Sequence, residues 1–324
     1  MMVPVMFATR EVAGTGLEVT ELGMGCAMIG DLWEATHDVQ AFATIEAAYS
    51  TGVRFFDTAP WYGMGKSELR LGFGLRGRPD VVVATKVGRV LHRGGTLDWA
   101  SRWKGGLPFD LRFDYTYSGI MRSYEDSLQR LGMPEVQALA IHDLDLLYHK
   151  TQEGVDARFA ELESGIQALD ELKSTTGVRA IGAGINRTGL IPRFLERFAL
   201  DYFLVAMPYT LLNQDGLAEL DLCHSRGVSV VIGAPYASGL LASGTTRPAT
   251  YDYGAAPAEM IEKTKRLEAL AERHGIPLAA AALQFVLRHP AVVSVVPGPN
   301  TPQQALQNAQ YFQTPIPEAF WHEL

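Results

Sequence analysis

The sequence predicts a closed (β/α)₈ barrel, in which eight parallel strands alternate with helices. Short apolar runs rich in Val, Ile and Phe alternate along the chain with longer stretches of helical periodicity. Most of these runs are apolar throughout, as is typical of parallel strands buried on both faces. No change of composition divides the 324 residues, so we expect one domain over residues 1–324, with an open doubly wound sheet as the alternative fold. The eight expected strands are Glu21–Cys26, Val53–Asp57, Val81–Lys86, Val136–His142, Val178–Gly184, Tyr202–Met207, Val228–Gly233 and Val292–Pro297.

The expected helices have apolar side chains at helical spacing and end at or before a glycine, which is favoured just beyond a helix C-terminus. The clearest of them cover Asp38–Thr51, Ser118–Leu131, Phe159–Thr175, Asp215–Arg226 and Ala258–His274.

Two segments lie outside the strand–helix repeat. Phe7–Glu21 places Gly14-Thr15-Gly16 between alternating residues, which predicts a β-hairpin that plugs the barrel floor. Gly88–Tyr117 is a 30-residue loop after the third strand. A connection of that length inside a compact domain is usually functional or disordered, and its aromatic residues favour a functional loop.

The composition indicates a globular protein of the cytoplasm. Hydrophobic residues make up 47% and charged residues 20%, which excludes a disordered chain or a coiled coil. The net charge of −8 argues against nucleic acid and anionic membranes as partners. Two cysteines give no disulfide framework. The chain has no apolar run of the ~20 residues that span a bilayer, and its start lacks the features of a signal peptide.

Reactive side chains end three successive expected strands. Asp57, Lys86 and His142 occupy these ends, and Tyr62 follows Asp57 by five residues. Because the active site of such a barrel lies at the carboxyl ends of its strands, we expect the four side chains to converge. A tyrosine hydroxyl has an ordinary pKa of about 10, and a neighbouring ammonium lowers it. Such a set can move a proton on or off an alcohol or carbonyl oxygen.

Each of these residues alone could have a packing or capping role, and His142 with Asp143 could instead bind a metal in a barrel hydrolase. The sequence has neither a His-x-His nor an HExxH pattern, and no other histidine ends an expected strand. We therefore expect no metal site.

These residues belong to motifs that resemble the signature of the aldo-keto reductases. The motifs occur in the family's order and are Phe55-Phe56-Asp57-Thr58-Ala59-Pro60-Trp61-Tyr62-Gly63 with Gly65-Lys66-Ser67-Glu68, then Ala84-Thr85-Lys86-Val87-Gly88, Ile141-His142-Asp143 and Val296-Pro297-Gly298. The resemblance implies that Tyr62 is the general acid/base, that Lys86 and Asp57 tune it, and that His142 orients the substrate oxygen. It also implies direct hydride transfer between the substrate carbon and C4 of a nicotinamide.

The resemblance further implies a dinucleotide extended across the strand ends, since no G-x-G-x-x-G follows the first strand. Asn186 would then contact the nicotinamide carboxamide, and Cys26 could approach the cofactor or be a small buried thiol. Two family positions differ, with Ala206 in place of a glutamine and Gly233 in place of the stacking aromatic residue, for which Tyr209 or Tyr236 could compensate. The remaining cofactor contacts implied are Ser238, Gly239, Leu241, Pro297, Gly298, Asn300, Gln304 and Asn308.

The charge of the C-terminal region predicts NAD rather than NADP. A 2′-phosphate needs an arginine or lysine to bind it, and no Lys or Arg follows Arg288. The alternative is that Arg187 or Arg247 reaches the phosphate.

Within the family, the chain resembles a branch of aldose dehydrogenases, with a pyridoxal dehydrogenase as a relative. The marks include Glu125-Asp126-Ser127-Leu128-Gln129-Arg130-Leu131-Gly132 and Tyr209-Thr210-Leu211-Leu212. The resemblance implies oxidation of a cyclic hemiacetal to its lactone, with an aldose such as L-fucose or a D-threo-aldose expected before pyridoxal. Less favoured alternatives within the family are a general aldehyde reductase and a nicotinamide-sensing binding subunit, and the four intact residues Asp57, Tyr62, Lys86 and His142 count against the binding subunit. Sugars and pyridine rings both stack on aromatic faces, and the candidate substrate contacts are Trp33, Trp61, Trp99 and Trp103.

Overall fold

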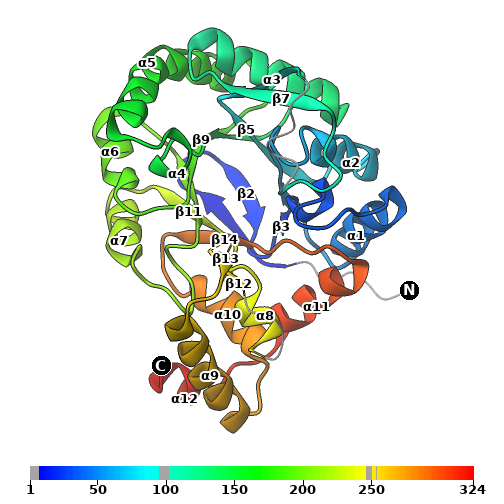
Figure 1. Cartoon of the computed structure of the whole chain (residues 1–324), viewed down its shortest axis with the longest axis vertical. Coiled ribbons are helices and arrows are strands. Elements are labelled where there is room, and N and C mark those ends of the chain that lie inside the picture. Colours follow the sequence, from blue (N-terminus) through cyan, green and yellow to red (C-terminus); the bar gives the residue numbers. More distant parts are fainter. Residues whose placement is uncertain (1–6, 95–101, 246–249, 253) are drawn as a thin grey trace.

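The computed structural model describes residues 7–94, 102–245, 250–252 and 254–324, and its centre is a barrel of eight parallel strands (Figure 1). The strands follow one another in the order β14-β11-β10-β9-β8-β5-β4-β3. The first and last strands also meet, because Leu22 bridges Val295 in parallel and the amide of Gly23 donates to the carbonyl of Val295 at 2.9 Å. The predicted barrel is therefore confirmed, and the open sheet is not what the chain forms.

Each expected strand overlaps one barrel strand, which in most cases is shorter than expected, and β5 and β9 each extend one residue past the expected end. Phe56 and Ile141, for example, are buried, as the uniformly apolar pattern predicts for strands covered on both faces. The barrel strands are β3 Met24–Gly25, β4 Phe55–Asp57, β5 Val82–Val87, β8 Ala138–His142, β9 Ala180–Ile185, β10 Tyr202–Ala206, β11 Ser229–Gly233 and β14 Val292–Val296.

Helices surround the sheet (Figure 1). The start expected at Phe159 is wrong, because the helix begins at Gln152, where the Thr151 hydroxyl caps it by accepting from the amide of Gly154 at 3.0 Å. The helices are η1 Met28–Gly30, α1 Asp38–Ser50, α2 Lys66–Gly74, α3 Tyr117–Leu131, α4 Leu146–His149, α5 Gln152–Thr175, α6 Leu190–Arg197, α7 Leu217–Ser225, α8 Leu240–Ser243, α9 Ala258–Arg273, α10 Leu278–Val286, α11 Pro302–Gln313 and α12 Glu318–His322. Within the described ranges, no helix is long and apolar enough to cross a membrane.

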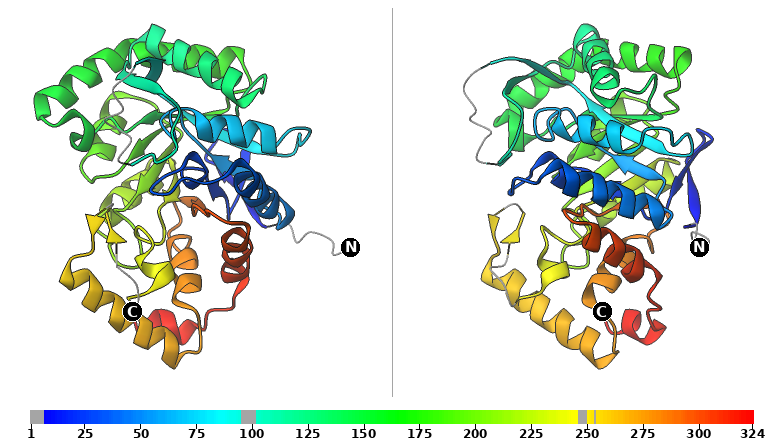
Figure 2. Two further views of the ribbon diagram at one scale, coloured as in Figure 1. Left: turned by 45° about the vertical axis from the view of Figure 1, so that its right-hand side comes forward. Right: turned by 90° about the vertical axis from the view of Figure 1, so that its right-hand side faces the viewer.

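The N-terminal hairpin closes one end of the barrel. Its strands, β1 Thr9–Val12 and β2 Leu17–Thr20, pair in antiparallel fashion. Val12, Leu17 and Val19 are buried in one cluster with side chains of the barrel strands, and Arg10 donates to the carbonyl of Val292 at 2.8 Å. The right-hand view of Figure 2 shows this hairpin on one side of the molecule and the short hairpin of β12 (Thr250–Tyr251) and β13 (Gly254–Ala255) on the opposite side. The predicted plug is confirmed, so the opposite end is left for a functional site.

The long connection after the third barrel strand contains a hairpin that the sequence did not predict. β6 (Arg89–Arg93) and β7 (Phe109–Phe113) pair in antiparallel fashion from Arg89↔Phe113 to Arg93↔Phe109. The hydroxyl of Tyr115 then donates to the carbonyl of His142 at 2.8 Å, which joins the connection to the end of β8. Trp99 lies outside the described residues.

Candidate active site

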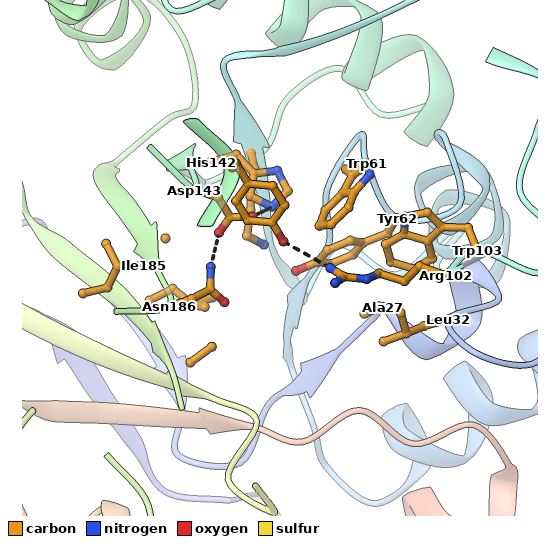
Figure 3. A pocket seen from close by; sticks show the side chains of 15 residues that line it. Ala27, Leu32, Trp61, Tyr62, Arg102, Trp103, His142, Asp143, Ile185 and Asn186 are labelled. Atoms are coloured by element: carbon orange, nitrogen blue, oxygen red, sulfur yellow. Dashed lines mark hydrogen bonds and ion pairs between the residues drawn. The ribbon is translucent and has the colours of Figure 1, made fainter. Parts of the chain in front are cut away.

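A pocket of about 530 Å³ opens at the carboxyl ends of the barrel strands (Figure 3). Three of the four expected catalytic residues line it, namely Tyr62, Lys86 and His142. The fourth, Asp57, lies behind Lys86. The structure therefore brings together the side chains that the sequence placed at three different strand ends.

The ammonium of Lys86 is held by two oxygen acceptors in the barrel interior. It donates to Asp57 Oδ2 at 2.6 Å and to the carbonyl of Thr58 at 2.8 Å, and both charged side chains are buried. Burial raises the pKa of Asp57, and the charge of Lys86 opposes this rise. Lys86 Nζ lies 4.9 Å from the centroid of the Tyr62 ring. A positive charge at this position stabilises a phenolate more than a phenol, so the geometry lets Tyr62 exchange a proton more readily.

His142 faces Tyr62 with its ring nearly perpendicular, at 5.9 Å between ring centroids. Burial holds the pKa of His142 well below its ordinary value, and the positive charges of Arg89 and Lys86 add to this effect. The imidazole is consequently neutral at pH 7 and can form a hydrogen bond to an uncharged substrate oxygen.

Aromatic rings form one wall of the pocket. Trp103 lies 5.4 Å from Trp61 and 5.6 Å from Tyr62 between ring centroids, and Trp61 lies 5.2 Å from Tyr148. Trp33 is 45% exposed and does not line the pocket. Of the expected substrate contacts, Trp61 and Trp103 lie in the wall, Trp33 lies outside it, and Trp99 lies beyond the described residues.

Backbone hydrogen bonds fix the long connection against the loop that carries Tyr62. The amide of Leu107 donates to the carbonyl of Gly63 at 2.9 Å, and the amide of Lys104 donates to the carbonyl of Asp31 at 3.0 Å. Lys66 adds donors from its side chain, to Asp31 Oδ2 at 2.6 Å and to the carbonyl of Gly105 at 2.9 Å. These contacts hold Trp103 on Tyr62. Neither Asp31 nor Lys66 was expected as a site residue, because their pairing joins segments that lie far apart in the chain.

Arg102 also lines the pocket and was not expected there. Its Nη1 donates to the hydroxyl of Tyr148 at 3.2 Å, and its guanidinium carbon lies 5.3 Å from the centroid of the Trp61 ring. The pocket wall thus presents hydrogen-bond donors among the aromatic rings, a combination suited to a ring with polar substituents.

Buried amide side chains mark the expected cofactor site after two of the barrel strands. Asn186 follows β9 and lines the pocket, while Asn300 and Asn308 follow β14. The amide of Asn300 donates to Gln304 Oε1 at 2.6 Å, and the hydroxyl of Tyr236 donates to Asn308 Oδ1 at 2.8 Å.

The other expected cofactor residues lie on the loops that follow β11 and β14, which are neighbours in the sheet. Ser238 and Gly239 have φ angles of 60° and 98° directly before α8, and Leu241 is buried in that helix. Pro297 is buried and Gly298 exposed after β14. Cys26 is fully buried and does not line the pocket.

The strand ends next to Lys86 leave room for a planar ring. β9 ends beside Gly184 and β10 ends at Ala206, and both of these residues line the pocket with Lys86. A Cβ at Gly184 would meet its nearest neighbours only at 3.8 Å. Gly233, at the end of β11, does not line the pocket. The residues present therefore fit a nicotinamide beside Lys86 and Asn186. Tyr209 and Tyr236, the two possible replacements for the missing stacking ring, do not line this pocket. The ring of Tyr209 stacks on that of Phe285 at 5.4 Å between centroids, and the hydroxyl of Tyr236 donates a hydrogen bond to Asn308.

Comparison with known proteins agrees with this architecture. Residues 21–324 match the Aldo/keto reductase family, and the chain belongs to that family. It is therefore an oxidoreductase of a family that uses nicotinamide cofactors.

Two relatives resemble the chain over nearly its whole length. Pyridoxal 4-dehydrogenase of Microbacterium luteolum is 40% identical, over 97% of this chain and 96% of the relative. D-threo-aldose 1-dehydrogenase of a Pseudomonas species is 38% identical, over 96% of this chain and 95% of the relative. The holo form of an aldo-keto reductase from Bacillus halodurans has the same fold, with a TM-score of 0.78 at 24% identity, over 98% of this chain and 94% of that one.

Proposed function

We propose that this protein oxidises a cyclic hemiacetal to its lactone with NAD⁺ as the hydride acceptor. The observation that carries the proposal is the convergence of Tyr62, Lys86 and a neutral His142 on a pocket walled by aromatic rings. The names of the two relatives point to an aldose carbon 1 and to a pyridoxal carbon 4. Both aldehydes close to cyclic hemiacetals in water, so one arrangement of groups serves either substrate.

In the proposed mechanism Tyr62 acts as the general base. Its phenolate takes the proton of the hemiacetal hydroxyl, so that a carbonyl forms as the C–H bond breaks. Lys86 stabilises the phenolate, and Asp57 keeps Lys86 charged and oriented at 2.6 Å. His142 holds the reacting oxygen through a hydrogen bond. The chemistry that nicotinamide supplies when bound is acceptance of the hydride at C4. In the reverse direction Tyr62 returns the proton to the oxygen.

The surroundings of Asn300 support NAD over NADP. The Asn300 side-chain amide donates to Glu34 Oε2 at 3.3 Å, which places an acidic group beside the loop expected to contact the adenosine ribose. A carboxylate there favours a ribose hydroxyl and repels a 2′-phosphate. Arg187, the alternative phosphate ligand, is paired through both terminal nitrogens with Asp252, at 3.0 and 2.8 Å. Arg247 lies outside the described residues.

An aldose is the first candidate substrate, and pyridoxal is the second. The donors of Arg102 among the rings of Trp61, Trp103 and Tyr148 suit the hydroxyl groups and apolar face of a sugar. The 40% identity to a pyridoxal 4-dehydrogenase favours the pyridine compound.

We place the reaction in the cytoplasm, where NAD⁺ is available.

The test is the rate of reduced-coenzyme formation, NADH from NAD⁺ or NADPH from NADP⁺, with L-fucose, D-arabinose, L-galactose and pyridoxal as substrates. Turnover of a sugar with NAD⁺ supports the aldose, and turnover of pyridoxal alone supports the second candidate. Tyr62→Phe is the control, because it keeps the ring against Trp103 and removes only the proton acceptor. Activity that survives in Tyr62→Phe would contradict the mechanism, and inactivity of the wild type on all four compounds would contradict the substrate class.

A further inference from the structure

The carboxylate of Asp143 contacts two residues that the proposed function assigns to different ligands. Asp143 Oδ2 lies 3.3 Å from His142 Nε2, the group proposed to hold the substrate oxygen. Asp143 Oδ1 accepts from Asn186 Nδ2 at 2.8 Å, the group expected at the nicotinamide carboxamide (Figure 3). One carboxylate therefore connects the substrate side of the pocket with its cofactor side.

The backbone at Asp143 explains how consecutive residues can both face the pocket. Side chains of successive residues in a strand normally point to opposite faces. Asp143 has a φ of 46°, which turns the chain at the end of β8, while its amide still donates to the carbonyl of Gly184 at 3.2 Å. Both His142 and Asp143 consequently line the pocket. A positive φ is uncommon for a residue other than glycine, so this placement is held by the surrounding contacts.

Arg89 fixes the carboxylate from behind. Its Nη2 donates to Asp143 Oδ2 at 2.7 Å, and the side chain is fully buried. The guanidinium carbon lies 4.1 Å from the Trp61 ring centroid and 4.4 Å from that of Tyr148, so two aromatic faces hold it. The buried guanidinium of Arg89 has few alternative positions in these contacts, so its ion pair with Asp143 holds the carboxylate in place.

We propose that Asp143 is a positioning residue that holds His142 and Asn186 in a fixed relation, and so aligns the substrate oxygen with the nicotinamide. The proposal rests on the proposed function for the roles of those two residues. It assigns no proton transfer to Asp143. Displacing this carboxylate should release both of its neighbours, whereas a purely structural role would affect the fold as a whole.

The first experiment measures cofactor binding without turnover. Dissociation constants of NADH and of ADP-ribose, which lacks the nicotinamide, are obtained from quenching of protein fluorescence for wild type, Asp143→Asn and Asn186→Ala. In Asp143→Asn we expect Kd for NADH to rise about tenfold, because a charged hydrogen bond behind the carboxamide ligand is lost, and Kd for ADP-ribose to stay near wild type. In the Asn186→Ala background, Asp143→Asn should add little. An equal rise for both ligands, or no rise for NADH, would overturn the proposal.

The second experiment asks whether Asp143 acts through His142. Asp143→Asn should lower kcat at least about tenfold with a smaller change in KM, and it should lower kcat little further in a His142→Ala background. The same loss in both backgrounds would show that Asp143 does not act through His142.

Asp145→Asn is the matched control for the loss of a negative charge. Asp145 lies two residues away, its carboxylate caps α4 at the amide of Leu147, and Asn186 Nδ2 approaches it only to 3.3 Å. Asparagine caps helices as well as aspartate does. Asp145→Asn should therefore reduce kcat much less than Asp143→Asn, and equal losses would argue for a general charge effect. If the wild type turns over no hemiacetal, the proposed function fails, while the comparison of NADH with ADP-ribose still decides the role of Asp143.

Discussion

Lys86 and Asp57 form an ion pair of 2.6 Å at the base of the pocket, where both side chains are buried. An ion pair in such a place is costly to desolvate and contributes little stability by itself. Its position beside Tyr62 gives it a chemical use, since it keeps a positive charge next to the phenol. The pair is therefore better explained by catalysis than by folding, and this explanation can be tested.

Lys86→Met should lower kcat at least about 100-fold, because Tyr62 loses the charge that favours its phenolate. Cofactor affinity should stay close to wild type. The same variant should lose about 3 kcal/mol of unfolding free energy, since Asp57 is left unpaired in the interior. Initial rates and chemical denaturation measure the two effects. Asp57→Leu combined with Lys86→Met should recover stability without activity, and recovery of activity in that double variant would contradict the catalytic role.

The activity should decrease as the pH is lowered through about 6. Burial raises the pKa of Asp143 to about 6, with Asp145 adding to the rise and Arg89 and Lys86 opposing it. Protonation below that pH turns one acceptor oxygen into a donor and weakens the contacts to Arg89 and Asn186. His142 stays neutral over this range because its pKa is held well below the ordinary value.

The measurement is kcat/KM against pH with an aldose, which has no titrating group there. Asp143→Asn should lack the decrease near pH 6. A decrease that persists unchanged in this variant would assign it to another group.

Coenzyme preference should move toward NADP in Gln304→Arg. Gln304 is exposed in the first turn of α11, and its side chain contacts the amide of Asn300. An arginine there can pair with a 2′-phosphate, so the ratio of kcat/KM for NADP⁺ to that for NAD⁺ should rise about tenfold or more. Gln310→Arg places the same charge on an exposed position later in the helix and should leave the ratio near wild type. Equal effects of the two substitutions would contradict a local phosphate contact.

Substrate affinity should depend on Trp103 and much less on Trp33. Trp103 is buried against Trp61 and Tyr62, whereas Trp33 is 45% exposed. Trp103→Phe should raise KM about tenfold, because the ring that packs on Tyr62 becomes smaller, and Trp33→Phe should change KM little. Steady-state kinetics with one sugar gives KM for both variants. A larger rise in KM for Trp33→Phe than for Trp103→Phe would restore the expected role of Trp33 as a substrate contact.

The sequence predicts the barrel and the convergence of the candidate catalytic residues because both have local signals. Uniformly apolar runs end at Asp57, Lys86 and His142, and the carboxyl ends of parallel strands meet at one end of a barrel. The hairpin of β6 and β7 had a partial signal, since Phe109–Phe113 alternates apolar and polar residues, but its partner strand lies far back in the chain.

No local sequence pattern predicts that Arg89 is buried beside the pocket. Arginine side chains are mostly exposed in proteins, and the burial of Arg89 depends on Trp61, Asp143 and Tyr148, which come from other segments of the chain. Long-range ion pairs of this kind follow from the folded arrangement and not from local patterns. For the same reason, the contacts of Asp31 with Lys66 could not be foreseen.

The packing of Trp61 and Trp103 around Tyr62 has a practical consequence. Two of the five tryptophans of the chain form the wall of the catalytic pocket, so a molecule that enters it must change the surroundings of an indole. Emission from these rings can therefore report occupancy of the site directly, in the unlabelled protein and without turnover. The enzyme carries its own optical probe at the place where its chemistry is expected.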